Sequence, residues 1–398
     1  MNLPTDRVTG TLRTYDLVIL VSLLWFMVQF LRFVFPPLFE TFQGLYGVTN
    51  TQTGILFTAM MLAYASVQFP AGVLGDRIGR PVVILGGAVV FSGAALLAAF
   101  SPGFLVVLVA AVLIGLATGP HKAVAIPLLS NQYPDRTGRA LGAMDTIGQF
   151  GGMTAPLVVV AFLGIAFWQG VFILGAALSL AFSFLFYLRI RGDESLQVRG
   201  APTETDADDD GGEASYVSVF ADRDLLVFML VTMLFTFAWN GLSSFFPLFL
   251  ATEKGVSSGN AGALYSLLFA VSISQAVTGD LSDRVGRLSV GVLLFGAMFV
   301  GVVSLLFVGS LPALAAITVL IGVGFHGFRP VRDSYLVDVI PDDIGGGTLG
   351  VVRTGMTTIG ALAPAIIGYL SDTAGFETAF AVIGAAAAGA GVLVYSLR

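Results

Sequence analysis

The chain has 398 residues, of which 56% are hydrophobic and 11% charged, and its formal net charge is −6. Soluble globular proteins carry about a quarter charged residues, so this composition excludes that class and predicts a membrane protein. There is no cysteine, which excludes disulfides and thiolate catalysis, and two isolated histidines do not make a metal site.

Apolar runs between polar breaks predict twelve membrane-spanning helices, because about 20 apolar residues cross a bilayer. We therefore expect an all-α membrane protein with two pseudo-symmetric six-helix bundles, at residues 1–189 and 223–398. An acidic linker at 190–222 joins them, and its segment 193–213 carries a net charge of −7. The predicted spans are approximately 15–37, 51–74, 81–100, 103–131, 139–163, 167–189, 223–250, 258–280, 288–309, 312–338, 347–370 and 376–397.

A short charged signature follows the second predicted span of each half. Gly72-Val-Leu-Gly-Asp76-Arg77-Ile-Gly79-Arg80 matches Gly279-Asp-Leu-Ser-Asp283-Arg284-Val-Gly286-Arg287 at an offset of 207 residues. Pro134-Asp135 and Pro341-Asp342 repeat at the same offset. A duplicated membrane protein of this kind places its binding site between the halves, near the bilayer midplane.

The loops on one side of the predicted membrane protein hold nearly all of its loop arginines. The loops on the other side contain only Lys254 as a lysine or arginine. By the positive-inside rule, both termini and the linker are cytoplasmic, and we expect a multi-pass protein of a prokaryotic plasma membrane.

On these features the whole chain resembles the major facilitator superfamily. The resemblance implies that the protein is no enzyme and needs no cofactor, and that it performs secondary transport by alternating access. Helices 1, 4, 7 and 10 would then line the cavity. The arginine that many proton-linked members carry in helix 4 is absent from Val107–Gly119, so a standard proton/drug antiporter is not indicated.

The resemblance also implies that the signature loops are gates. Asp76 would meet the positive N-terminal end of helix 11, and Asp283 would meet helix 5 near Arg139, while the cytoplasmic side is closed. The alternative is a loop that only sets topology, in which the arginines retain it in the cytosol. The sites named here are Gly72, Asp76, Arg77, Gly79, Arg80, Gly279, Asp283, Arg284, Gly286 and Arg287, whose glycines are expected to allow close packing and a tight turn.

Ionisable residues inside the predicted spans suggest the substrate. Lys122 and Arg329 are related by the repeat and should lie at equal depth in opposite halves. Two cations facing one cavity would suit an anion, with His121, His326 and Arg32 as lesser contributors.

Other membrane charges predict structural ion pairs. We expect Asp333 to pair with Arg353, and Asp145 to pair with Lys122 or Arg139. The alternative for every one of these charges is a helix-packing contact without a role in substrate binding.

The sequence thus predicts a monomeric secondary transporter of a small anionic solute, and it leaves coupling to a proton or to a counter-solute open. It predicts no metal, nucleic-acid or cofactor partner. The alternatives are an efflux carrier for amphipathic, drug-like compounds, or a non-transporting receptor on the same fold. Gly322-Val-Gly324-Phe-His-Gly327 matches a dinucleotide fingerprint but lies inside a membrane helix with no strand before it.

Overall fold

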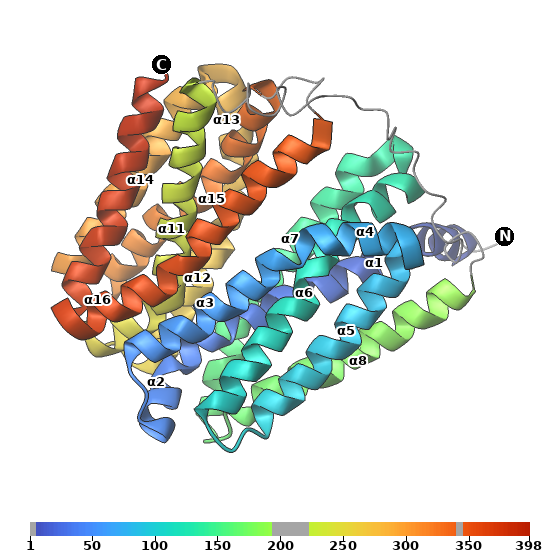
Figure 1. Ribbon diagram of the computed structural model, residues 1–398, viewed down its shortest axis with the longest axis horizontal. Coiled ribbons are helices and arrows are strands. Elements are labelled where there is room, and N and C mark those ends of the chain that lie inside the picture. The colour runs from blue at the N-terminus through green and yellow to red at the C-terminus, as the bar shows by residue number, and fades with distance from the viewer. Residues whose placement is uncertain (1–4, 193–222, 340–344) are drawn as a thin grey trace.

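The computed structural model describes residues 5–192, 223–339 and 345–398, and within these ranges it contains helices but no strand (Figure 1). Side chains are described except at 5–14, 337–339 and 345–357. Most of the predicted linker lies outside the described residues. The N-terminal half contains α1 (Thr5–Phe33), α2 (Phe35–Tyr46), α3 (Asn50–Ser66), α4 (Gln68–Ile78), α5 (Arg80–Ala99), α6 (Phe104–Gln132), η1 (Pro134–Arg136), α7 (Thr137–Leu163) and α8 (Gln169–Arg191). The C-terminal half contains α11 (Arg223–Thr252), α12 (Ser258–Ala270), η2 (Val271–Ile273), α13 (Ser274–Val285), α14 (Arg287–Phe307), α15 (Leu311–Val339) and α16 (Gly345–Ser396).

These helices confirm the predicted twelve spans. Ten helical stretches of the described chain are long and apolar enough to cross a membrane, and α3 with α4, bent by 42°, adds an eleventh. The twelfth arises inside α16, where Gly375 has φ 83° and ψ 161° and divides one continuous stretch into two spans.

The first span is longer than the sequence indicated. It runs over Tyr15–Tyr46 and is broken at Val34, between α1 and α2. Pro36 and Pro37 occupy the first turn of α2, where a missing N–H costs no hydrogen bond. The predicted end at residue 37 is therefore wrong, because these prolines begin a second helix of the same span.

The two signature loops share one unusual backbone conformation. Gly79 has φ 100° and ψ 129°, and Gly286 has φ 101° and ψ 133°. Only glycine adopts this region readily, so both copies need glycine to turn from one span into the next. We call the end of the molecule that carries these two loops the signature end.

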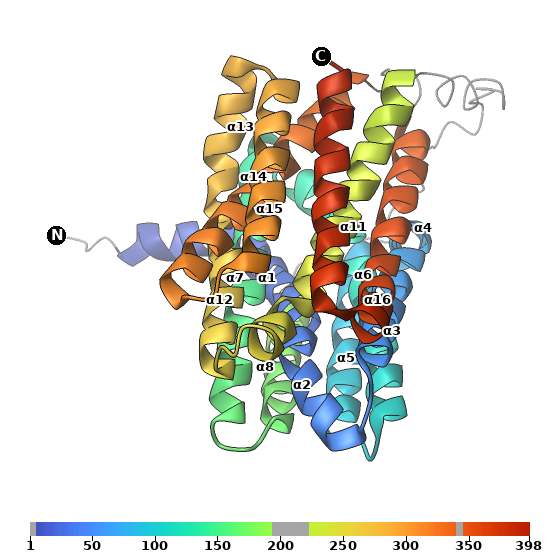
Figure 2. The ribbon, with the colours of Figure 1, turned by 90° about the vertical axis from the view of Figure 1, so that its left-hand side faces the viewer.

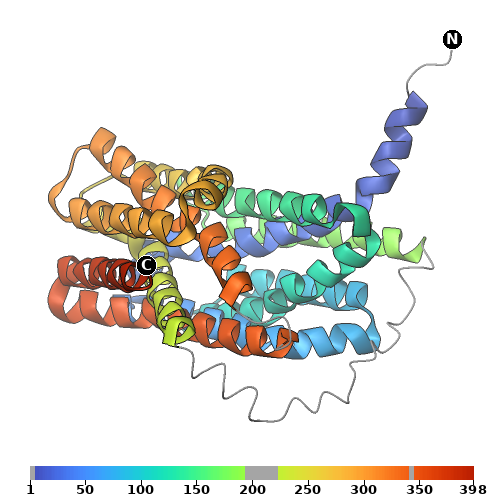
Figure 3. The same cartoon turned by 90° about the horizontal axis from the view of Figure 1, so that it is seen from above.

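The two halves meet mainly at the other end of the molecule. Seen from above, they lie side by side (Figure 3). In Figure 1 they converge where the start of α3 meets the bend in α16, and they spread apart toward α4 and α13 at the signature end. Helix α3 packs along α16, as Figure 2 shows, and α7 packs along α12, which gives two seams related by the repeat.

The α3–α16 seam brings backbones into direct contact. A Cβ on Gly54 would lie 2.3 Å from the carbonyl oxygen of Pro364, and one on Gly368 would lie 2.4 Å from that of Asn50. The backbone N–H of Ala365 donates to the Thr58 hydroxyl at 3.0 Å. Small residues at such crossings let membrane helices approach closely.

A carboxylate closes the end of this seam. Asp372 of α16 accepts hydrogen bonds from the backbone N–H of Asn50 at 3.1 Å and of Thr51 at 2.7 Å, and from the Thr51 hydroxyl at 2.6 Å. Asn50 and Thr51 begin α3, so an acid of one half satisfies the free N–H groups of a helix in the other. We call this contact the Asp372 joint.

Candidate functional site

Three cations lie deep in the membrane-spanning helices. Arg32 is close to the middle of the first span, Tyr15–Tyr46, and not near its end as the sequence suggested. Lys122 and Arg329 each lie four residues past the midpoints of α6 and α15, toward the signature end. At a rise of about 1.5 Å per residue, this offset is roughly 6 Å.

Lys122 has a carboxylate partner in its own half. Its Nζ lies 2.9 Å from Oδ1 and 3.2 Å from Oδ2 of Asp145 on α7. The two side chains are 39% and 48% exposed, and the ammonium group also lies 5.7 Å from the ring centre of Trp25. Of the two partners that the sequence left open for Asp145, the structure has Lys122.

Arg329 and Arg32 have no ion pair within the described part of the chain. The guanidinium of Arg329 lies over the ring of Trp239 at 5.2 Å, and that of Arg32 lies over the ring of Tyr64 at 4.0 Å. The Nη2 atom of Arg32 is buried without a described hydrogen-bond partner. The charges that act most on Arg329 are those of Arg332 and Asp333 on its own helix, and those of Asp145 and Arg32 in the other half act less.

The two histidines are packed inside their own halves. His121 stacks on Trp25 with ring centres 5.6 Å apart, and its Nε2 donates to the Val21 carbonyl oxygen at 3.1 Å. His326 is fully buried, with its ring 5.1 Å from that of Trp239 and 6.1 Å from that of Phe269. Both ring nitrogens of His326 are buried without a described hydrogen-bond partner, and a contribution of the two histidines to the substrate site stays a prediction.

The same small module thus occurs in each half. In the first half, Trp25 of α1 contacts a histidine and a cation of α6. In the second half, Trp239 of α11 contacts a histidine and a cation of α15. The sequence reasoning missed Trp25, Tyr64 and Gln29. The signal for Gln29 was available, because it is a polar residue one turn before Arg32 in an apolar helix, and its buried Oε1 has no described partner.

Asp333 has a different described partner from the one expected. Its Oδ1 accepts two bonds from Arg332, at 2.9 and 2.8 Å, and Arg332 also lies 5.9 Å from the ring centre of Phe235. Arg353 is among the residues whose side chains are not described, so the pair expected with Asp333 stays a prediction.

The signature loops carry local charge pairs. Arg80, at the start of α5, bonds Asp76 of α4 at 3.0 Å, and Arg284 bonds Asp280 within α13 at 2.8 Å. Asp283 is exposed. The remaining cations of the loops differ in their placement: Arg77 is exposed, and Arg287 donates to the Ser334 carbonyl oxygen at 3.0 Å.

The glycines of the signature play unequal parts. Gly79 and Gly286 make the turns, but a Cβ on Gly72 would meet nothing within 4 Å and one on Gly279 would only touch Pro330 at 3.8 Å. The close packing expected at Gly72 and Gly279 is therefore wrong for this conformation. Gly75 fills that role instead, since its Cβ would lie 2.8 Å from Val124.

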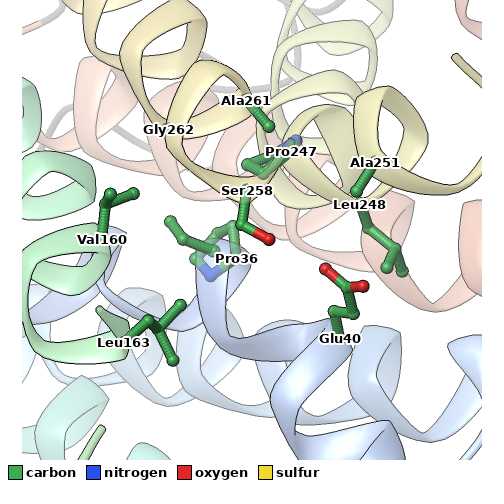
Figure 4. Close-up of a pocket in the computed structure, with 11 residues that line it drawn as sticks. Pro36, Glu40, Val160, Leu163, Pro247, Leu248, Ala251, Ser258, Ala261 and Gly262 are labelled. Carbon is green, nitrogen blue, oxygen red and sulfur yellow. The ribbon is translucent and has the colours of Figure 1, made fainter. Parts of the chain in front are cut away.

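Two pockets lie away from the three cations. One is at the far end of the molecule, between α2, α7, α11 and α12, and Glu40 is its single charged lining residue (Figure 4). The other adjoins the second signature loop and is lined by residues including Asp283, Arg287 and Arg398. No group of His, Asp or Glu among the described residues could hold a metal ion.

Comparisons with known proteins agree with this architecture. Residues 21–311 and 228–398 match the family profile described as Major Facilitator Superfamily. The hexuronate transporter of Bacillus subtilis strain 168 is 26% identical over 371 residues, covering 87% of this chain and 86% of that protein. The protein named "Probable sulfoacetate transporter SauU" of Cupriavidus necator is 25% identical, with 85% and 83% covered. The gentisate transporter of Corynebacterium glutamicum is 27% identical, with 79% and 72% covered.

A solved structure shares the fold. The inward-facing, unoccupied form of a bacterial homolog of the human lysosomal transporter Spinster superposes with a TM-score of 0.76 at 16% identity. The match covers 97% of this chain and 95% of that chain.

Proposed function

Because the chain belongs to the major facilitator superfamily, we propose that it is a secondary active transporter that carries a small organic anion by alternating access. The family and the transporters among its relatives indicate a transporter of a small solute rather than an enzyme. The anionic substrate and the mechanism are our proposal.

One observation carries the anionic assignment. Three cations of the described residues, Arg32, Lys122 and Arg329, lie deep in the spans, where Asp145 is the described acid. Arg332, nearer the end of its span, is balanced by Asp333. Charges at membrane depth are costly unless they are balanced, so a positive excess favours an anionic ligand. Three of the relatives are named for hexuronate, sulfoacetate and gentisate, which are organic acids, and others are named "Putative proline/betaine transporter".

Alternating access is supported by where the halves touch. The seams and the Asp372 joint hold them together at one end, while α4 and α13 spread apart at the signature end. With the signature end placed in the cytoplasm, this conformation is open to the cytoplasm, and both termini lie there. Asp76 and Asp283 would then make their gating contacts in the opposite, outward-open conformation.

The runner-up is an efflux carrier for amphipathic compounds, in which the buried cations serve structure. The Lys122–Asp145 pair favours that reading for Lys122 alone. Coupling to a proton or to a counter-solute is compatible with either function.

Ligand screening with the purified protein tests the proposal. We expect organic carboxylates and sulfonates to raise the melting temperature and to enter proteoliposomes. Stabilisation by lipophilic cations only, with no effect of any anion, would contradict the anionic assignment and favour the efflux carrier.

The gating role has its own test. Asp76→Asn removes the charge that would meet helix 11, so we expect it to increase labelling of positions near the signature end. Unchanged labelling together with unchanged transport would leave the loop a topological device.

A further inference from the structure

The positive excess of the membrane interior can be assigned to two particular residues. Asp145 is bonded to Lys122, and Asp333 is bonded to Arg332. Once these pairs are formed, Arg32 and Arg329 remain, and neither takes part in an ion pair with any described residue. Among the described side chains, the excess is therefore two charges on two guanidinium groups.

Contacts with aromatic rings do not replace the missing acids. Tyr64 lies under Arg32 and Trp239 under Arg329, and the negative face of a ring attracts a cation. This attraction is weaker than that of a carboxylate, and a ring accepts none of the directed N–H bonds of a guanidinium. Nη2 of Arg32 is indeed buried, and it bonds no residue that the structure describes. The rings hold the two groups in place and leave their donors available.

The two arginines belong to opposite halves. Arg32 precedes the break at Val34 between α1 and α2, and Arg329 immediately precedes Pro330 in α15. The ring of Phe269 lies 4.5 Å from that of Phe33, the neighbour of Arg32, and 5.7 Å from that of Trp239, which lies under Arg329. Both arginines therefore adjoin one aromatic cluster between the halves, where like charges repel each other. A ligand that carries negative charge at both ends relieves this repulsion and balances both groups.

Guanidinium groups select the chemistry of that ligand. Each presents paired donors that match the two oxygens of a carboxylate, or of a sulfonate or phosphate, more specifically than a point charge does. The charge of Lys122 is already balanced by Asp145. This reassigns one of the two cations that the sequence put forward, from Lys122 to Arg32.

We propose that Arg32 and Arg329 form a two-point site for a dianion, such as a dicarboxylate or a sulfonated carboxylate, with one acidic group on each arginine. The inference rests on the proposed transport of organic anions and specifies its substrate class. Because each end of the ligand is held by a different half, binding links the halves at mid-depth, away from the Asp372 joint. Occupancy by a dianion also leaves the site electroneutral.

The test compares each dianion with its own singly charged analogue. Malonate, succinate and glutarate are titrated into the purified full-length protein by calorimetry, each beside the monoamide of the same acid. We expect at least one dicarboxylate of the series to bind at least about tenfold more tightly than its monoamide, since one charged, bidentate contact is lost. Equal affinities throughout the series overturn the inference.

Variants assign the two contacts. Arg32→Gln and Arg329→Gln should each abolish the preference for the dianion, whereas Arg32→Lys and Arg329→Lys should keep part of it. The matched control is the double variant Lys122→Gln/Asp145→Asn, which removes a neutral pair at similar depth and should keep the preference. A preference that survives either single glutamine variant overturns the two-arginine site. Where a glutamine variant does not fold, the comparison of dianion and monoamide in the unaltered protein decides.

Failure of this inference and failure of the proposed function give different results. Transport of monoanions with no preference for dianions overturns the dianion site and leaves an anion transporter. No binding of either kind of anion, with stabilisation by lipophilic cations, overturns both.

Discussion

The cations of the membrane interior share one kind of contact, since Arg32, Lys122 and Arg329 all lie over aromatic rings. Such contacts contribute about 0.5–2 kcal/mol. A charge at the centre of a spanning helix costs about 2.5–3.5 kcal/mol on insertion scales. The ring offsets only part of this cost. Lys122 is balanced further by Asp145, whereas the two arginines keep their charge for a ligand.

The Lys122–Asp145 pair leads to a prediction on stability. Lys122→Gln or Asp145→Asn alone leaves an unbalanced charge at membrane depth, so each should lower the melting temperature. The double variant should lose less than the sum of the two, with a coupling of about 1 kcal/mol because both side chains are partly exposed.

A double-mutant cycle in one detergent measures that coupling. The matched control is the exposed pair Arg284–Asp280, whose side chains are 73% and 61% exposed and whose coupling should be smaller. Additive losses at Lys122 and Asp145 would show that the pair contributes no coupling.

Residue pairings were the least predictable feature of the site. The sequence located the membrane cations, because a charge in an apolar run is visible without a structure. It could not decide the partner of Asp145, since Lys122 and Arg139 were both within reach along the chain. The depth of Arg32 was misjudged for a different reason: Pro36 and Pro37 read as the end of a span, although proline is equally suited to the first turn of a new helix.

At the level of elements, the α3–α16 seam carries much of the contact between the halves. Its sequence signals were small: Gly54, Gly368 and Thr58 are unremarkable in a chain with 49 glycines. Asp372 was not predicted at all, because a single acid beyond a span has no partner that sequence spacing identifies. The contact depends on how two distant helices meet, which only the fold determines.

Removing the charge of Asp372 should weaken this seam. Asp372→Asn keeps the shape of the side chain but removes its negative charge from the N-terminus of α3. The lost interaction between charge and helix end is worth about 1 kcal/mol, or roughly a fivefold change in the population of the joined state, in which α3 and α16 are in contact. Spin labels on cysteines introduced at Leu45 and Leu311 report the separation of the halves at this end. No native cysteine has to be removed first, because the chain contains none.

The control for Asp372 is Glu377→Gln, which changes an exposed acid on the same helix. We expect a longer Leu45–Leu311 distance only in Asp372→Asn. Equal distance distributions in the two variants would exclude a role of the joint in holding the halves together.

A steric change in the same seam should act more strongly. The added methyl of Gly54→Ala would lie 2.3 Å from the Pro364 carbonyl oxygen, so the helices must separate. We expect a wider Leu45–Leu311 distribution and a shift away from the joined state. Gly86→Ala is the control, because a Cβ there meets nothing within 4 Å. A normal distribution in Gly54→Ala would contradict the close contact.

Over the whole molecule, the duplication accounts for most of what the sequence predicted correctly. Twelve apolar runs, the 207-residue offset and the paired signature loops together specify the fold, because the period of the apolar pattern and the turn glycines are local properties. The relative placement of the halves is not local. It depends on two seams whose contacts join residues hundreds of positions apart, such as Asp372 and Thr51.

Low pH should shift the molecule away from the joined state, because it protonates Asp372. Partial burial raises the pKa of Asp372, but hydrogen bonds from Thr51 and Asn50 outweigh it and leave the pKa below the ordinary value of 3.8. The ionised form therefore favours the joined state. The contribution of the ionised Asp372 to the joined state is complete at a pH above the ordinary pKa of 3.8. It is lost as the pH falls through the lowered pKa.

The Leu45–Leu311 distance should consequently lengthen only in strong acid. Asp372→Asn should remove this acid-dependent part of the response. An unchanged acid response in that variant would assign the effect to other groups.

The two seams are related by the repeat, but among the described residues only the α3–α16 seam carries a charge contact. At the corresponding place in the first half, an offset of 208 residues from Asp372 leads to Gly164, which has no side chain to bond the start of α12. The α7–α12 seam is held by contacts such as Gly262 against Val160 and Gly152 against Phe269. We expect the halves to separate first along α3 and α16 while α7 and α12 stay in contact. The opening would then be a hinge rotation about the α7–α12 seam.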